Sequence, residues 1–208
     1  MPTGGAADME QSMSTESGIP MQSSTGEGFE KGAPMSIPQA RENVNPTGDM
    51  SNCQTCVVTY EARMRGYDVE ALPNDKTNIM VSALEHNQNM AWIDPKTGQI
   101  PLPILKYDLK DEQDCYDWLN STIQNGERYT LTWRWKHEYV GHVVNVDKDS
   151  NGNVRIYDPQ GNIEVSGKEN LLDYMKDFAY ESPLKILRVD NLELFMPVVY
   201  KVIKPSRN

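Results

Sequence analysis

The sequence lacks a long apolar run, an excess of positive charge and a recognisable set of metal ligands. No stretch of its 208 residues is long and apolar enough for a signal-peptide core or a membrane span. There are 30 acidic and 20 basic residues, and the net charge of −10 argues against binding to nucleic-acid phosphates. The three cysteines do not form the two CxxC pairs of a zinc site. We therefore expect no membrane span, no nucleic-acid partner, no metal and no cofactor.

Aromatic residues are scarce in the N-terminal quarter of the chain. Residues 1–49 contain seven Gly, five Pro and ten Ser or Thr, with Phe29 as the only aromatic residue. Such a composition buries too little apolar surface to offset the entropy lost when a chain becomes ordered. We therefore predict a disordered leader or linker over 1–49 and one folded domain over 50–208.

The predicted domain begins with helical patterns and continues with strand patterns. Apolar spacing predicts helices over 53–65, 111–124 and 169–180, and it places Glu61 and Arg63 mostly off the buried stripe of the first helix. From residue 129 the period changes to two, which predicts strands at 129–135, 139–146, 154–157, 184–190 and 195–203. This order indicates an α+β domain in which an N-terminal helix packs on a mostly antiparallel sheet.

Cys53 lies at the start of the first predicted helix, where thiols become reactive. Ser51 or Asn52 can cap this helix, and Gly66 can end it. The free N–H groups and the positive end of the helix dipole favour thiolate over thiol, which predicts a nucleophile at Cys53. Cys56 is the rival nucleophile, one turn farther inside. The CxxC spacing also fits a redox motif, but no strand of a βαβ unit precedes it.

His142 is the candidate general base for this thiol. It lies in an apolar strand pattern, where an imidazole needs a polar partner. The turn-rich segment 147–152 predicts a hairpin that brings Asp158 close to His142, so that a carboxylate can orient the imidazole. The pattern predicts neighbouring strands, without fixing contact between the two side chains. Solvated or structural roles are expected for the other candidates, which are His86, His137 and Cys115.

The hairpin turn also matches a calcium-binding loop at several positions. Asp147, Asp149, Asn151 and Gly152 occupy the first, third, fifth and sixth positions of an EF-hand loop, and Asp158 occupies the last. EF-hand loops join two helices, whereas both flanks here have strand patterns. Asp and Asn are also common in hairpin turns. We therefore interpret the segment as a hairpin turn.

Three segments together resemble one protein family. They are NCQTCVVTYEARMRGYDVEA at 52–71, GHVVNV at 141–146 and YDPQG at 157–161. Their order and spacing are similar to those of the papain-fold toxin domain of bacterial polymorphic toxins and phage-associated effectors, the Tox-PL protein glutamine deamidases. The resemblance spans residues 52–200 and implies a papain-like cysteine hydrolase fold.

The resemblance also implies a reaction and a set of site residues. A triad of Cys53, His142 and Asp158 would hydrolyse the side-chain amide of a target glutamine to glutamate through a thioester. Some related deamidases use a glutamine as the third member, so Gln160 remains an alternative or assisting residue. The Cys53 N–H would hold the oxyanion, with Asn52 and Gln54 as the nearest candidates for a second donor.

The resemblance further implies where such a protein acts and with what. It implies a bacterial or phage origin, delivery without a classical signal peptide and action in the cytoplasm of a target cell. The expected partners are a target protein bearing a glutamine and, inside the producing cell, a cognate immunity protein. The same triad also fits a papain-like cysteine peptidase, and a non-catalytic adaptor or virion-associated domain is the third hypothesis.

Overall fold

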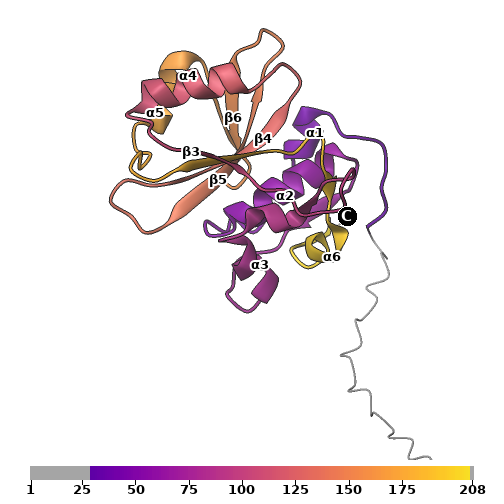
Figure 1. Ribbon diagram of the computed structural model, residues 1–208. Helices are drawn as coiled ribbons and strands as arrows, with labels where there is room; N and C mark the ends of the chain where they lie inside the picture. Colours follow the sequence, from indigo (N-terminus) through magenta and orange to yellow (C-terminus); the bar gives the residue numbers. More distant parts are fainter. Residues whose placement is uncertain (1–28, 207–208) are drawn as a thin grey trace, which may run out of the picture.

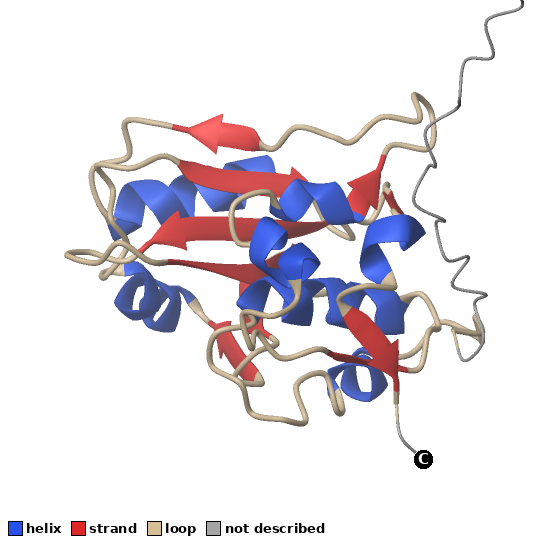
Figure 2. Cartoon of the chain, turned by 90° about the horizontal axis from the view of Figure 1, so that it is seen from below, coloured by secondary structure: helices blue, strands red, loops and turns tan. Residues whose placement is uncertain are grey.

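The structure, a computed structural model, describes residues 29–206. A six-stranded antiparallel sheet carries helices on both faces (Figures 1 and 2). The helices are α1 (Ile37–Arg41), α2 (Cys53–Met64), α3 (Ile79–Leu84), the short 3-10 helix η1 (Gln88–Ala91), α4 (Glu112–Thr122), α5 (Lys168–Met175) and α6 (Met196–Val199). The strands are β1 (Val69–Ala71), β2 (Trp92–Ile93), β3 (Ile104–Lys106), β4 (Arg128–Arg134), β5 (Gly141–Lys148), β6 (Val154–Asp158), β7 (Ile163–Ser166), β8 (Leu184–Arg188), β9 (Glu193–Leu194) and β10 (Ile203–Pro205).

The large sheet has the strand order β3-β8-β4-β5-β6-β7, with all neighbours antiparallel. Trp133 on β4 is opposite His142 on β5, and Asn145 on β5 is opposite Tyr157 on β6. The predicted hairpin between β5 and β6 is thus confirmed. Two further ladders, β1 with β10 and β2 with β9, attach the C-terminal segment to the first part of the chain.

Alternating side chains of the sheet contribute to two different cores. Leu131, Val144 and Ile156 pack on one face against α4 and α5, whereas Val143 packs on the other face against α2. Successive strand residues point to opposite faces, so the period of two seen in the sequence supplies both cores. Figure 1 shows α4 and α5 on one side of the sheet and α2 on the other.

Helix α2 is buried on nearly all sides, contrary to the prediction of a single buried stripe. Of its 12 residues, ten are buried, including Glu61 at 0% and Arg63 at 5% exposure. These charged side chains are buried because each has partners. Arg63 donates to the carbonyl oxygens of Ala40 at 3.2 Å and Gln39 at 3.1 Å, and Glu61 accepts from Arg128 at 3.1 Å.

The predicted boundary at residue 50 is wrong for the described part of the leader. Residues 29–49 pack on the domain, with α1 against α2 and with Ala40 and Val44 buried. Gly66 ends α2 with φ +100°, and a Cβ there would overlap the carbonyl oxygens of Gly32 and Ala33. Few apolar residues suffice because hydrogen bonds from the domain satisfy the backbone of this segment. The remainder of the predicted leader, 1–28, lies outside the described residues.

The C-terminal prediction also needs correction. The apolar run 195–203, predicted as one strand, contains α6 and only the start of β10. Pro197 sits in the first turn of α6, where its missing N–H is tolerated, although it would interrupt a strand ladder. Helix α5 ends at Met175, earlier than predicted. None of the helices within residues 29–206 has the length and apolar character needed to cross a membrane.

Candidate active site

Three secondary-structure elements bring the predicted site residues together at one end of the sheet. Cys53 is the first residue of α2, His142 is the second residue of β5, and Asp158 is the last residue of β6. Because β5 and β6 are antiparallel, the start of one strand lies beside the end of the other. The residue before the histidine, Gly141, has no space for a side chain, since a Cβ there would lie 2.6 Å from the Trp133 carbonyl oxygen.

His142 and Asp158 form the direct contact that the sequence pattern left open. The distance from His142 Nε2 to Asp158 Oδ2 is 2.7 Å, and the side chains are only 11% and 12% exposed. The other carboxylate oxygen accepts the Gln160 N–H at 3.0 Å. Asp158 is therefore held from two sides and fixes the orientation of the imidazole.

The electrostatic surroundings favour a protonated His142 next to Cys53. Burial opposes the charge on the imidazole, but the hydrogen bonds to Asp158 and Cys53 outweigh it and raise the pKa of His142 to about 9. An imidazolium at neutral pH is the natural counterion of a thiolate. A histidine and a cysteine placed in this way are the two groups that nucleophilic cysteine chemistry requires.

Aromatic side chains enclose the imidazole. Trp135 stacks on His142 with 6.0 Å between ring centroids, and Trp133 meets it edge-on at 5.2 Å. Tyr174 on α5 packs edge-on against both tryptophans. Burial raises the pKa of Tyr174, and the charges of Asp158 and Cys53 raise it further, so this tyrosine lies near the site. The strand pattern predicted buried tryptophans but gave no sign of their contact with His142.

The two cysteines of the CxxC motif occupy different environments. Cys53 is partly exposed, whereas Cys56 is fully buried and its Sγ donates to Asn52 Oδ1 at 3.2 Å. Burial raises the pKa of the Cys56 thiol far above its usual range. These environments favour Cys53 over its rival as the nucleophile. All three cysteines of the chain are free thiols.

Asn52 and Gln54, the candidates for a second oxyanion donor, use their side-chain amides in contacts with other parts of the domain. Asn52 is buried and its Nδ2 donates to Asn45 Oδ1 at 3.1 Å and to the Leu72 carbonyl oxygen at 3.2 Å. Gln54 Nε2 donates to the Val81 carbonyl oxygen at 3.3 Å, and its Oε1 faces the Cys53 thiol at 3.5 Å. Within residues 29–206, the backbone N–H groups of Cys53 and Gln54 have no acceptor. These two backbone donors remain available to an oxyanion.

Gln160 has a different neighbour from the one expected of a third triad member. Its Nε2 lies 3.4 Å from Asn52 Oδ1, and its carbonyl oxygen accepts from Asn45 Nδ2 at 3.0 Å. It therefore connects the Asp158 turn to the start of α2, whereas Asp158 forms the hydrogen bond to the imidazole. Asn45 was missed because it lies in a segment whose composition is typical of a linker.

A buried ion-pair cluster fixes the other end of α2. Glu61 accepts two hydrogen bonds from Arg128 on β4, both at 3.1 Å, and pairs with Arg65. Asn145 Nδ2, on the same strand as His142, lies 3.4 Å from Glu61 Oε1. We refer to Glu61, Arg65, Arg128 and Asn145 as the Glu61 cluster. It connects α2 to the strand that carries the imidazole.

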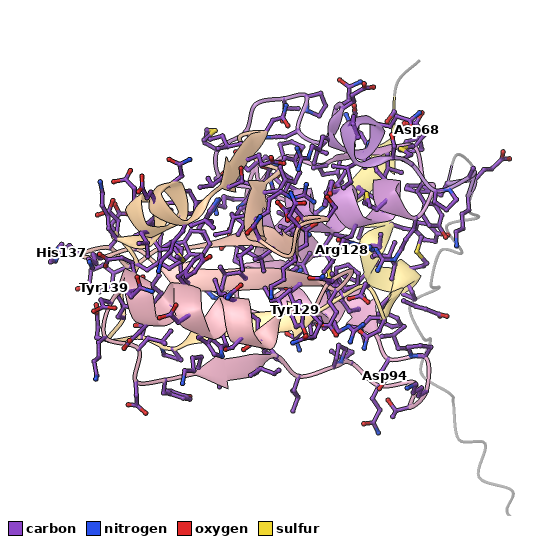
Figure 3. All side chains as sticks on the ribbon, turned by 90° about the horizontal axis from the view of Figure 1, so that it is seen from above. Asp68, Asp94, Arg128, Tyr129, His137 and Tyr139 are labelled. Carbon is purple, nitrogen blue, oxygen red and sulfur yellow. The ribbon has the colours of Figure 1, made fainter. Side chains whose placement is uncertain are left out.

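The remaining sequence candidates lie away from these contacts. His86 and His137 are exposed, and His137 marks the outer end of the β4–β5 loop in Figure 3. In the suspected calcium loop, Asp147 is paired with Arg155 at 2.8 Å, and Asp149 accepts from two backbone N–H groups of its own turn. The flanks of that turn are strands β5 and β6, as expected for a hairpin.

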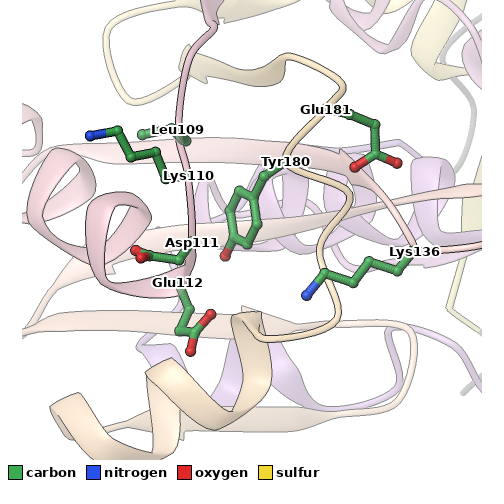
Figure 4. A pocket seen from close by; sticks show the side chains of 7 residues that line it. All are labelled: Leu109, Lys110, Asp111, Glu112, Lys136, Tyr180 and Glu181. Carbon is green, nitrogen blue, oxygen red and sulfur yellow. The ribbon is translucent and has the colours of Figure 1, made fainter.

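A separate hollow lies at the start of α4 (Figure 4). Carboxylates of Asp111, Glu112 and Glu181 line it together with the ammonium groups of Lys110 and Lys136. Because the lining carries both positive and negative groups, it favours neither an anionic nor a cationic ligand. None of the three proposed triad residues lines this hollow.

The fold and the site together define a cysteine hydrolase with a papain-like fold. The family described as papain fold toxin 1, glutamine deamidase, matches residues 51–162, which is a little more than half of the chain and includes Cys53, His142 and Asp158. The chain belongs to this family. The resemblance noted in the sequence is thereby confirmed, and so is the papain-like fold that it implied.

Other comparisons add little to this assignment. No curated protein matches the chain. Among solved structures, the crystal structure of the Pseudomonas avirulence protein AvrPphB is similar at a TM-score of 0.38 and 12% identity, over 81% of this chain and 99% of that one.

Proposed function

We propose that the protein is a toxin or effector that deamidates a glutamine side chain of a target protein. The observation that supports this most directly is the contact of Asp158 with His142, next to the partly exposed thiol at the start of α2. The family match supplies the reaction class, because its members are described as glutamine deamidases.

In the proposed mechanism, Cys53 and His142 form a thiolate–imidazolium pair oriented by Asp158. The thiolate attacks the carboxamide carbon of the glutamine, and the oxyanion that forms accepts hydrogen bonds from the backbone N–H groups of Cys53 and Gln54. His142 then donates its proton to the departing nitrogen. Ammonia is released, and the glutamine side chain remains bound to Cys53 as a thioester. Water attacks the thioester with His142 as the base, which releases glutamate and restores the thiol.

The site residues keep distinct roles in this mechanism. Trp133 and Trp135 shield the imidazolium from water, which strengthens its attraction to the thiolate. Gln160 and Asn52 hold the two halves of the site together and take no part in proton transfer. Cys56 serves as a buried side chain of the helix.

Intact-mass spectrometry of a treated glutamine-containing protein tests the proposal. Each deamidated glutamine exchanges an NH₂ group for an OH group, so the chain gains that mass difference and remains whole. Shorter fragments would instead favour the papain-like peptidase, which shares the triad. An unchanged mass, together with unaltered toxicity of the Cys53→Ala protein, would favour a non-catalytic adaptor or virion-associated domain.

The family also suggests the setting of this reaction. We propose a bacterial or phage effector that acts on a protein in the cytoplasm of a target cell. A producing cell that holds an active deamidase requires an immunity protein that covers the site. Co-expression with neighbouring genes of the producer tests this, since a true immunity protein restores growth and binds the wild-type chain.

A further inference from the structure

The ten large apolar side chains that are exposed within residues 29–206 fall into two groups. One group lies along the chain around β3 and consists of Ile100, Leu102, Ile104, Leu105 and Tyr107. The other consists of Met50, Ile79, Tyr139, Val140 and Ile163, which come from four separate segments of the chain. We call this second group the apolar rim, because a short stretch of chain, a strand pairing or a hydrogen bond connects each of its segments to a residue of the proposed site.

Two members of the apolar rim adjoin His142. Tyr139 is 98% and Val140 is 59% exposed, and they precede the histidine by three and two residues. Trp135, which stacks on His142, donates its N–H to the Val140 carbonyl oxygen at 3.3 Å and so closes the loop. Figure 3 shows Tyr139 at the outer end of this loop. The apolar tip of this loop is therefore tied to the tryptophan that stacks on the imidazole.

The other members adjoin Asp158 and Cys53. Ile163, at 50% exposure, is the cross-strand partner of Asp158 on β7. Met50, at 74%, lies three residues before Cys53, no more than about 11 Å along the chain. Ile79, at 84%, begins α3, and the Val81 carbonyl oxygen of that helix accepts from Gln54, the neighbour of Cys53. Each triad residue thus has exposed apolar neighbours.

We propose that the apolar rim binds the polypeptide around the target glutamine, and that the preferred target carries large apolar residues on both sides of it. This inference rests on the proposed deamidase function. Exposed apolar side chains are the groups that binding surfaces bury, and a partner that covers these residues would lie over the segments that carry Cys53, His142 and Asp158. A free glutamine has no side chains for the rim, so the rim selects a protein segment.

The β3 group provides a matched control surface. It has the same chemistry and comparable exposure, with Leu102 at 85% and Tyr107 at 54%. Strands β8 and β4 separate β3 from β5, which places the group about three strand spacings, roughly 14 Å, from the strand of His142. Substitutions there remove equal apolar surface without touching the site.

The test compares two peptides that differ only in the residues flanking one glutamine, leucine on both sides or serine on both sides. Ammonia release is measured with the full chain, with the rim variant Ile79→Ser/Tyr139→Ser and with the control variant Leu102→Ser/Tyr107→Ser. The wild type should prefer the leucine peptide by about tenfold or more in kcat/KM, as expected for burial of one or two leucines. The rim variant should lose most of this preference, because its KM for the leucine peptide rises. The control variant should keep the preference.

Equal use of the two peptides by the wild type would overturn the inference while leaving the deamidase intact. A loss of preference in the control variant as large as in the rim variant would also overturn it. If the wild type releases no ammonia from either peptide, the proposed function fails and the rim inference fails with it. All four substituted residues are at least half exposed, so the variants are expected to fold normally.

Discussion

The two ends of helix α2 differ in almost every physical respect. At its start, Cys53 is partly exposed and two backbone N–H groups have no acceptor within residues 29–206. Toward its end, Glu61 is fully buried and bound to Arg128 and Arg65. One helix thus carries a reactive end and a fixed end. The fixed end adds buried ion pairs to the hydrogen bonds that Asn52 makes at the helix start.

The Glu61 cluster also sets where the reactive end lies. Glu61 is eight residues beyond Cys53, about 12 Å along a helix, and Asn145 is three residues beyond His142, about 10 Å along a strand. Helix α2 and strand β5 are therefore linked at two places, Cys53 with His142 and Glu61 with Asn145. The distance between these two places is similar along the helix and along the strand. A shift of the helix along the strand would disturb both links together.

The largest expected effect comes from removing the reactive group itself. Cys53→Ala should lower ammonia release from a glutamine peptide by about 10⁴-fold or more, because no other thiol reaches the site. Cys56→Ala, one turn away, should keep activity within about threefold and lose about 1 kcal/mol of stability through its hydrogen bond to Asn52. Loss of activity in the Cys56 variant, with its fold intact by circular dichroism, would contradict the assignment of the nucleophile.

Asp158→Asn should give the next largest effect and also change the pH profile. Activity should fall by about 10²–10⁴-fold, because the imidazole loses its charged partner. In the wild type the pKa of His142 is raised to about 9, so the ion pair persists at neutral pH and is lost as the pH rises through that value. Without the carboxylate this pKa falls, and the alkaline limb of the kcat/KM profile should move to lower pH.

An unchanged alkaline limb in the Asp158→Asn protein would contradict the proposed link between the two residues. Asparagine keeps an oxygen that can accept the Gln160 N–H, so the turn itself should remain in place. Gln160→Ala serves as the matched control. It should lower activity far less and leave the alkaline limb where it is.

Glu61→Gln tests the fixed end of the helix. It should lower the free energy of unfolding by about 3 kcal/mol, the lower end of the range for a broken buried pair, since both arginines retain some contact with water. Urea denaturation measures this change. A change below about 1 kcal/mol would mean that the cluster resembles an ordinary surface ion pair.

Asn45→Ala, a substitution near the reactive end of α2, should have the smallest effect. The substitution removes donors to Asp49 and Gln160 and an acceptor for Asn52, so about 1–2 kcal/mol of stability should be lost. Activity should fall only severalfold, because no group that touches substrate is removed. Thermal unfolding and ammonia release together measure the two losses. No change in either would show that the described leader segment does not support the site.

Strands β4, β5, β6 and β8 and the closeness of His142 to Asp158 were predictable because local patterns determine them, whereas the edge strands β3 and β7 were not predicted. The change from helical to alternating spacing near residue 129 follows from strand geometry, and the Asn151-Gly152 turn joins β5 to β6. A histidine in an apolar strand needs a partner, which pointed to Asp158. These inferences depend on residues that are close in sequence or joined by one hairpin.

Features that depend on distant partners were not predictable. Glu61 looked solvated because its partner Arg128 lies 67 residues away, and no helical periodicity reveals such a pairing. The side-chain contacts of Asn52 and Gln54 with Asn45, Leu72 and Val81 were likewise not visible in the sequence, because these partners lie 7 to 27 residues away. The apolar run around Pro197 is typical of a strand, but the proline is tolerated in the first turn of α6 and would interrupt a strand ladder.

The packing of residues 36–49 on α2 determines where the chain can be shortened when this domain is fused to another protein. A fusion that begins at residue 50 would remove the carbonyl groups of Gln39 and Ala40 and leave the buried Arg63 guanidinium short of acceptors. It would also remove the Asn45 side chain that holds Asn52 and Gln160. The smallest portable unit with a complete site therefore begins before Ser36, inside a stretch whose composition resembles a spacer.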